Sequence, residues 1–479
     1  MSDEWIDIFQ KEQGSLSEQP WTLEPPAIEH LLEKIRRGCW QLESPETCIV
    51  GVGYDTELNE ARLDRELDNE KAPKHGVFIL TERETAELDL EKRLLVKMVK
   101  GFQIQRYALL DQGHLLLNTN AETDIDRCPN TKKHLTRFRK QLEERDAMPR
   151  CAWFGVGLPK NRELFEDNPT KILVPKYATG NKFAYDDGEG YYCISDAYVI
   201  VRSGESKTDL RYILAVLNSR MMEFYHKKVS KLKREGYYEY FAEQLRRLPI
   251  KKIDLERKEE KAVHDKLTAL VSRLVDAKKR LLSIEKAFAE CLALYPSSEA
   301  RLKTYYEYEG VQPSVLNEFN RKNGTVYAFK VARDGQNLRL LIMYKLEENQ
   351  NEESVTVETP AVDLKVKDEK LCNFIFLSLR KLASETRRRK LGDGNILETI
   401  LTQIQIPTFV TNKNENLKLI HKVMDRFDSR TEKTLSRGMS VEELEETVQT
   451  DDNEMERIVR DLYNLTRDEV NIVESELAS

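Results

Sequence analysis

The chain has 479 residues, of which 40% are hydrophobic and 33% charged, and its formal net charge is −7. This length exceeds a single ordinary core, so we expect two to four domains. No apolar run reaches the roughly 18 residues of a membrane helix, and the polar start lacks the order of a signal peptide, which predicts a cytoplasmic protein without membrane contact. The acidic balance excludes a uniformly basic surface, so any nucleic-acid contact must be local.

The seven cysteines are widely spaced, and the sequence contains no CxxC pair. This spacing argues against zinc knuckles and against a disulfide framework, and it predicts free, mostly buried thiols. The seven histidines do not cluster at ligand spacing, so no metal site is expected from them.

Periodicity and composition predict an α+β protein in which β-rich domains are joined by long charged helices. A stripe of apolar residues at helical spacing marks one such helix over 254–292. The six expected segments are a helical start at 1–47, a mixed α/β linker domain at 48–150, a β-rich domain at 151–253, a spacer helix at 254–298, a second β-rich domain at 299–411 and a helical end at 412–479.

Several local patterns predict individual elements. The residues Thr85–Gly101 have the composition of a helix closed by glycine. The strings FAYDDGEGYY and ARDGQN each contain turn residues between apolar runs, which predicts two hairpins. Near the end of the chain, Thr466 and Glu469 have the spacing of a capping box.

The motifs of catalysis are missing from this sequence. An adenine methyltransferase needs an Asn/Asp-Pro-Pro-aromatic loop that holds the flipped base, and the nearest strings, Asn168-Pro169 and Pro25-Pro26, lack the required neighbours. The FGVG string at 154–157 is not followed by a Rossmann-type unit, and no P-loop is present. Neither methyl transfer nor a nucleotide-driven motor is therefore expected, and no catalytic residue is assigned.

The stretch from Ile172 to Ile250 contains an ordered set of features. KILVPKY predicts an entry strand, Asp209-Leu210 opens a helix, and Leu217-Asn218-Ser219 is followed by a Lys-rich stretch and a closing Leu-Pro-Ile. In this order they resemble the TaqI-like C-terminal specificity (target-recognition) domain of N6-adenine DNA methyltransferases and type IIG restriction–modification enzymes. The flanking strings VKGFQIQRYALLDQGHLLL, HDKLTALVSRLVDAKKRL and RIVRDLYNLTRDEVNIVE are also similar to type IIG chains.

The resemblance implies contact with duplex DNA, and the charge of the region agrees with it. Residues 221–236 contain five Lys or Arg and two Glu, a net charge of +3 within an acidic protein. Basic groups hold phosphates, and Lys, Arg and Gln also read base edges. The alternative is a solvated basic helix face beside a buried aromatic seam. The predicted DNA-binding residues here are Lys176, Lys182, Arg220, Lys227, Lys228, Lys231, Lys233, Arg234 and Gln244.

Other polar and aromatic residues of this region have two interpretations. Asn218 and Ser219 are either structural, bonding to backbone, or base-reading. The aromatic residues are expected in the core rather than as stacking platforms; they are Phe183, Tyr185, Tyr191 and Tyr192.

A second stretch, 368–409, follows the same order as 209–250: an acidic start, an apolar helix, a basic run, a glycine, a glutamine and a closing proline. Pro249 and Pro407 lie 158 residues apart, and a charged helix is expected after each. This plan is similar to that of a type I specificity subunit, although chance similarity of two helix–strand units is the alternative. The basic run Arg387, Arg388, Arg389 and Lys390 would supply further phosphate contacts.

The sequence thus predicts a non-catalytic specificity subunit of a restriction–modification or related phage-defence complex. A separate adenine methyltransferase would be its partner and would carry S-adenosylmethionine, with a nuclease or translocase as a further partner. One rival function is an endonuclease component with a metal site at Asp363, Lys365 and Asp334. The other is an assembly subunit that does not read DNA.

Overall fold

The computed structural model describes residues 24–56, 58, 76–146, 148, 151–157, 161–295, 301–316, 324–346, 356–386, 404–435 and 440–478. The chain forms two compact units, which we call unit 1 (residues 1–278 and 448–479) and unit 2 (residues 279–447). Two helices, α8 (Lys258–Ala293) and α12 (Val441–Leu462), contribute residues to both units. Within the described ranges, no helix is both long and apolar enough to cross a bilayer.

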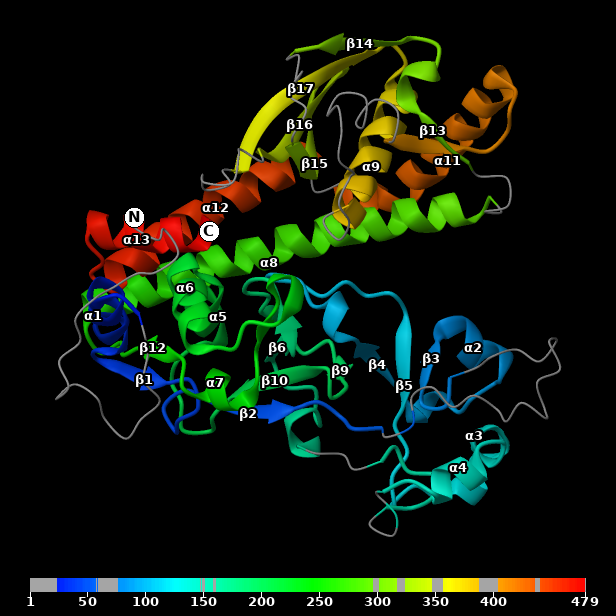
Figure 1. Cartoon of the computed structure of the whole chain (residues 1–479). Helices are drawn as coiled ribbons and strands as arrows, with labels where there is room; N and C mark the ends of the chain where they lie inside the picture. The colour runs from blue at the N-terminus through cyan, green and yellow to red at the C-terminus, as the bar shows by residue number, and fades with distance from the viewer. Residues whose placement is uncertain are drawn as a thin grey trace, which may run out of the picture. The chain divides into compact units, whose positions relative to one another are not determined.

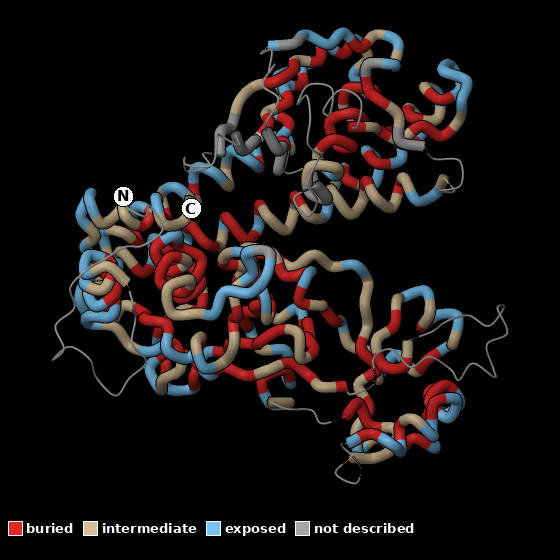
Figure 2. Tube along the Cα trace, in the orientation of Figure 1, coloured by how far each residue is buried: buried red, intermediate tan, exposed pale blue. Residues whose placement is uncertain are grey.

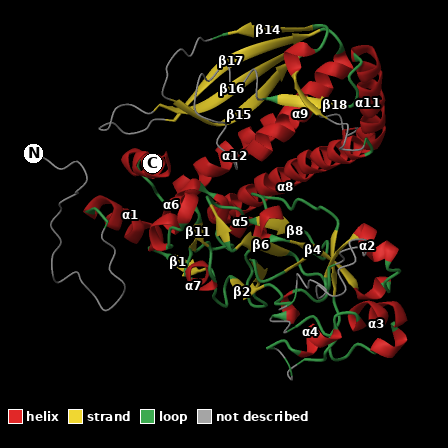
Figure 3. Cartoon of the chain, turned by 45° about the vertical axis from the view of Figure 1, so that its right-hand side comes forward, coloured by secondary structure: helices red, strands yellow, loops and turns green. Residues whose placement is uncertain are grey.

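Unit 1 consists of small sheets and the helices that cover them (Figures 1 and 3). Besides parts of α8 and α12, its helices are α1 (Pro26–Arg36), α2 (Glu82–Glu87), α3 (Pro129–Thr136), α4 (Arg139–Glu143), α5 (Leu210–Asn218), α6 (Arg220–Val229), α7 (Ala242–Arg246) and α13 (Arg467–Ala478). Its strands are β1 (Cys39–Gln41), β2 (Cys48–Val52), β3 (Ile79–Thr81), β4 (Leu95–Val99), β5 (His114–Leu117), β6 (Lys171–Pro175), β7 (Tyr177–Ala178), β8 (Ala184–Asp186), β9 (Tyr192–Cys193), β10 (Ala197–Arg202), β11 (Tyr238–Glu239) and β12 (Pro249–Lys251).

The central sheet of unit 1 has the strand order β2-β10-β6-β8, and all its pairs are antiparallel. Successive residues of β6 enter two different cores, because side chains alternate across a strand. Ile172 and Val174 pack with α5 and the apolar stripe of α8, whereas Leu173 packs with the second sheet, β3-β5-β4-β9. Burial of both faces explains why KILVP is almost continuously apolar.

Two local predictions for unit 1 are wrong. The residues Thr85–Gly101 do not form one helix, because Asp89 adopts a left-handed φ of 49° and Leu95–Val99 pairs as β4 with β5. The string FAYDDGEGYY does not form a hairpin either. Its two halves, β8 and β9, join different sheets, and β9 runs parallel to β4. Tertiary pairing overrides local propensity in both cases.

Unit 2 is built around an antiparallel sheet with the strand order β14-β17-β16-β15, and a helix packs against it. These elements are β14 (Val311–Val315), β15 (Gly324–Asp334), β16 (Asn337–Leu346), β17 (Thr356–Val366) and the helix α9 (Glu369–Thr386). The predicted ARDGQN hairpin is confirmed. β15 and β16 are paired up to Asp334 and Asn337, which flank the turn, and Gly335 within the turn has the positive φ of 57° that the turn requires. Besides parts of α8 and α12, unit 2 also contains β13 (Arg301–Thr304), β18 (Gln405–Thr408) and α11 (Lys413–Leu435).

The two units share a plan at their ends. In unit 1 the opening strand β1 pairs with the closing strand β12, and α8 follows. In unit 2 the opening strand β13 pairs with the closing strand β18, and α11 follows. The two prolines that close the similar stretches 209–250 and 368–409 lie in these closing strands. Pro249 is paired with Gln41, and Pro407 is paired with Leu302.

Candidate nucleic-acid interface

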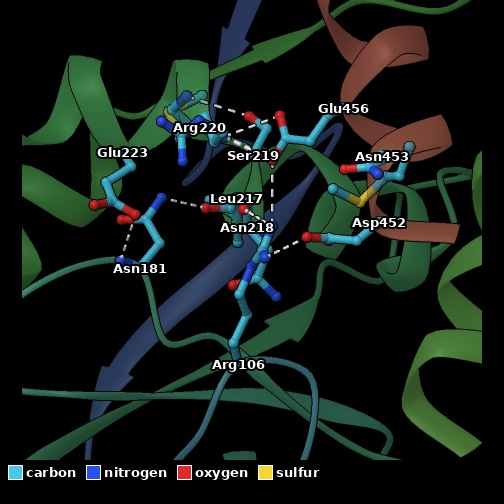
Figure 4. Close-up of polar contacts among 12 residues, drawn as sticks. Arg106, Asn181, Leu217, Asn218, Ser219, Arg220, Glu223, Asp452, Asn453 and Glu456 are labelled. Carbon is cyan, nitrogen blue, oxygen red and sulfur yellow. Dashed lines mark hydrogen bonds and ion pairs between the residues drawn. The ribbon is translucent and has the colours of Figure 1, made fainter. Parts of the chain in front are cut away.

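Asn218 is the last residue of α5 and lies in a group of polar contacts (Figure 4). Its side chain is 2% exposed, and both ends of its amide are engaged by one residue. Its Oδ1 accepts from the backbone N–H of Phe183 at 3.1 Å, and its Nδ2 donates to the Phe183 carbonyl at 2.9 Å. These bonds join α5 to the strand region of β8, so Asn218 holds the fold together.

Ser219 turns the chain from α5 into α6. Its hydroxyl donates to the carbonyl of Val216 at 2.8 Å and accepts from the N–H of Met222 at 3.2 Å, which caps the N-terminus of α6. Ser219 is completely buried and separates α5 from α6, in a part of unit 1 where most of the trace is buried (Figure 2).

A cluster of charged groups links this break to α12 (Figure 4). The Arg106 guanidinium contacts Asp452 at 2.6 Å and Glu456 at 3.2 Å, and it donates to the Asn218 carbonyl at 2.7 Å. Glu456 also accepts from the backbone N–H of Arg220 at 2.9 Å. Burial raises the pKa of Glu456 to about 7; the nearby Arg106 opposes this effect, and Asp452 adds to it. The cluster therefore fixes α12 against the Leu-Asn-Ser segment.

Four of the predicted DNA-binding residues form ion pairs inside unit 1. Arg220 pairs with Glu474 of α13, and Lys227 pairs with Glu223 at 3.1 Å. Two carboxylates, from Glu24 at 2.9 Å and Glu476 at 2.7 Å, surround Lys228. Although burial opposes its charge, these partners raise the pKa of Lys228. The fourth, Lys233, pairs with Glu239 at 2.6 Å while its side chain stays 48% exposed.

The other predicted residues lie in different surroundings. The side chains of Lys231 and Arg234 are exposed and make no ion pair with any residue that the structure describes. Lys176 lies over the ring of Phe241, 5.2 Å from its centre, and Lys182 is half-buried. The Oε1 atom of Gln244 is buried in α7 without a hydrogen-bond partner. The run Arg387, Arg388, Arg389 and Lys390 lies outside the described residues.

Lys231 and Arg234 belong to a small hairpin over residues 231–239, which we call the basic hairpin. Its two sides are joined by the Leu232–Tyr238 bridge and by the bond from Lys233 N–H to the Tyr237 carbonyl at 2.6 Å. The second side of the basic hairpin contains the strand β11, which pairs with β7. The basic hairpin is the part of the predicted interface in which exposed cations gather.

His226 contacts the basic hairpin at Glu239, the residue at its end. The His226 side chain is completely buried and is stacked on Tyr240, with ring centres 4.0 Å apart. Its Nε2 donates to the Glu239 carbonyl at 3.0 Å, and its Nδ1 is buried with no hydrogen-bond partner. Burial lowers the pKa of His226 to about 4, so the ring is neutral at pH 7. The aromatic residues Phe183, Tyr185, Tyr191 and Tyr192 are buried in the core, as predicted.

The low pKa of His226 makes unit 1 sensitive to acid. Because the folded pKa is below that of an unfolded His, the unfolded chain binds more protons below about pH 6.5, and stability falls with pH in the window from about 6.5 to 4. Between pH 7.5 and 5 we expect the wild type to lose about 2 kcal/mol more than His226→Gln in urea denaturation. His30→Gln, at an exposed position, should retain the full loss; equal losses for all three proteins would contradict this assignment.

One important pair was not predicted from the sequence. Lys171 and Asp186, on the paired strands β6 and β8, form an ion pair of 2.9 Å in which both side chains are 0% exposed. Asp186 also accepts from the N–H groups of Glu189 at 2.7 Å and Tyr191 at 3.0 Å. This carboxylate organises the DDGEG turn, which separates β8 from β9. The only signal in the sequence was a lysine at the start of an apolar strand.

In unit 2, Asp363, the residue of the rival nuclease site, forms an ion pair with Arg339. The Arg339 side chain donates to Asp363 from Nε at 2.8 Å and from Nη2 at 2.9 Å, and these hydrogen bonds lower the pKa of Asp363. Nowhere in the described ranges do three or more His, Cys, Asp or Glu side chains gather as a metal would need. The seven cysteines are free, and five of them are buried, as predicted.

Residues 96–250 match the family model of the TaqI-like C-terminal specificity domain. The matched range contains Arg106, the Leu-Asn-Ser segment and the basic hairpin, and it closes at β12. The matched family is the one that the residues of this segment resemble.

Two curated relatives come from Haemophilus influenzae. The Type II methyltransferase M.HincII is 25% identical over 209 residues, which are 42% of this chain and 41% of that protein. The Type II methyltransferase M.HindII, from strain ATCC 51907 / DSM 11121 / KW20 / Rd, is 23% identical over 276 residues, or 55% of this chain and 52% of that protein. The chain thus spans about half the length of the curated relatives that it matches.

Among solved structures, the chain is similar to the S subunit of a type I restriction–modification system from M. genitalium. The match covers 61% of this chain and 84% of the S subunit, at 12% identity and a TM-score of 0.25.

Proposed function

We propose that this chain is a DNA-reading specificity subunit that places a separate adenine methyltransferase at a defined duplex sequence. The observation that carries the proposal is the specificity-domain segment 96–250 with the exposed cations of its basic hairpin. Phosphate contacts fix the register of a protein on DNA, and base contacts supply specificity. The absence of the base-flipping loop from this sequence assigns the chemistry to the partner, which would bind S-adenosylmethionine.

The helices are the proposed docking surface for that partner. Within unit 1, apolar side chains of α8 and α12 pack together. Two ion pairs also join the helices, Lys266–Glu454 at 2.5 Å and Arg273–Asp451 at 2.7 Å. The Arg106 cluster then holds α12 against the specificity domain. A partner bound to these helices would sit at a fixed distance from the DNA-reading surface, which is the purpose of a rigid scaffold.

Unit 2 is proposed as a second recognition domain. The support is its shared plan, in which an opening and a closing strand pair and a long helix follows, as in unit 1. Each unit also contains a four-stranded sheet. Two such units would read two parts of a DNA site, and their separation would set the spacing between those parts.

Methylation mapping tests the proposed role. The chain is expressed in a host without N6-adenine methylation, alone and together with a methyltransferase subunit from its own genome that carries the Pro-Pro-aromatic loop. We expect methylated adenines at a single sequence motif only when both proteins are present, because one reads the site and the other flips the base.

Two results would contradict the proposal. Methylation by the chain alone would make it an enzyme. The same methylated motif with and without the chain would make it an assembly protein that does not read DNA. The matched control is the Lys231→Ala/Arg234→Ala variant of the chain, expressed with the same methyltransferase. Because this variant loses the two exposed cations but is expected to fold normally, it should lower methylation at the same motif.

A further inference from the structure

The basic hairpin exposes apolar side chains as well as cations. Among the described residues, seven large hydrophobic side chains are exposed, and three of them lie on the ribbon formed by the basic hairpin and β7. Leu232 is 62% exposed, more than the other six, and Tyr237 and Tyr177 are 38% and 45% exposed. Leu232 and Tyr237 lie one on each side of the basic hairpin, close to its tip.

The backbone holds these side chains in place. The tip is a turn at Arg234–Gly236, in which Gly236 has a φ of 75°, a conformation that side-chain-bearing residues rarely adopt. At the stem, the N–H of Glu239 donates to the Lys231 carbonyl at 3.1 Å, and the Glu239 carbonyl accepts from buried His226. The apolar exposure is therefore presented by an ordered ribbon.

The charge beside the apolar side chains indicates what covers them. Lys231, Lys233 and Arg234 flank Leu232 in the chain and are exposed like it, so a partner of this hairpin meets cations beside a leucine. Duplex DNA does this in its major groove, which is about 12 Å wide and admits a two-stranded ribbon between its phosphate rows. In that groove, the apolar group on the base edges is the C5 methyl of thymine.

We propose that the basic hairpin enters the major groove and that Leu232 contacts a thymine methyl group, with Tyr237 supporting it from the opposite side of the ribbon. This inference rests on the proposed function, because it names the base contact through which the chain would read its site. Lys231 and Arg234 hold the flanking phosphates, while Lys233 stays paired with Glu239 and stiffens the ribbon.

The test uses duplexes that the wild-type chain recovers from a randomised pool. Each thymine of the enriched site is replaced in turn by uracil, which removes only the methyl group. At one position we expect the uracil duplex to bind about 4-fold more weakly, because burial of one methyl group contributes about this factor to affinity. Leu232→Ala is expected to bind the thymine duplex about 10-fold more weakly and to become indifferent to uracil at that position.

Controls separate this contact from other effects. Leu294→Ala removes a leucine of similar exposure, 50%, outside the basic hairpin and should bind as the wild type does. The salt dependence of Leu232→Ala should be unchanged, because no charge is lost. Enrichment of a site with no effect of Leu232→Ala or of uracil would overturn this inference and leave the proposed function standing. A loss with Leu232→Ala that uracil does not reproduce would also overturn it and would indicate insertion between base pairs. A pool without enrichment would overturn both.

Discussion

Replacing Lys231, Lys233 and Arg234 together with Ala is expected to weaken duplex binding about 100-fold at 0.1 M salt, because each basic side chain at a phosphate releases a counterion. The slope of log affinity against log salt should fall by about 2, since Lys231 and Arg234 hold the phosphates and each lost phosphate contact removes about 0.9 from it. Fluorescence anisotropy with a labelled duplex, titrated at four salt concentrations, measures both quantities.

Two comparison variants make this result interpretable. The double variant Lys231→Ala/Arg234→Ala leaves the Lys233–Glu239 pair intact, so it should keep the fold and show most of the loss. The variant Arg83→Ala/Arg127→Ala removes two charges from side chains that are 87% and 82% exposed elsewhere in unit 1. It should change affinity less than twofold. Equal effects of the two double variants would show that overall charge, and not the basic hairpin, governs binding.

Asp186→Ala is expected to destabilise unit 1 by about 3 to 5 kcal/mol, the usual cost of removing one partner of a buried ion pair. The substitution leaves the ammonium of Lys171 in a site with 0% exposure, and it removes the acceptor of two backbone N–H groups. Urea denaturation followed by circular dichroism measures the loss.

An exposed pair of the same chemistry provides the matched control. Asp363→Ala breaks the Arg339–Asp363 pair, whose side chains are 53% and 29% exposed, and should cost less than about 1 kcal/mol. Replacing both buried partners, as Lys171→Met/Asp186→Leu, should recover much of the stability, because no charge is then left without a partner. Equal losses for Asp186→Ala and Asp363→Ala would contradict the buried-pair account.

Local signals predicted the elements that depend on neighbouring residues. The Asp-Gly pair at 334–335 places the β15–β16 hairpin, and the apolar stripe predicts α8, which forms at Lys258–Ala293. The capping box is present too, since Thr466 N–H donates to Glu469 at 2.7 Å and Glu469 N–H donates to the Thr466 hydroxyl at 3.3 Å. Such features need only residues a few positions apart.

The features that the sequence did not predict depend on distant partners. Arg106 and Glu456 lie 350 positions apart, and nothing in their local sequences indicates that they meet. The β4 strand was predicted as part of a helix because its leucines and valines fit either period, and only its pairing with β5 and β9 decides.

For the candidate site, the sequence predicted which basic residues are present but not which of them pair with carboxylates of the chain. The sequence identified the basic run. In the structure, Lys227 and Lys228 pair with glutamates, whereas Lys231 and Arg234 pair with no carboxylate in the described part of the chain. Whether a lysine contacts a carboxylate of its own chain depends on the fold around it. The exposed leucine between these cations became informative only when its place on the ribbon was known.

The central claim is that this chain reads duplex sequence, and selection from a randomised duplex pool tests it most directly. The full chain is incubated with the pool at 0.15 M salt, bound duplexes are sequenced over successive rounds, and the recovered site is footprinted. We expect one motif to be enriched and protected, and we expect enrichment to be lost in Lys231→Ala/Arg234→Ala. An even sequence distribution after repeated rounds, with no protected site for the chain alone or with its methyltransferase partner, would contradict the account.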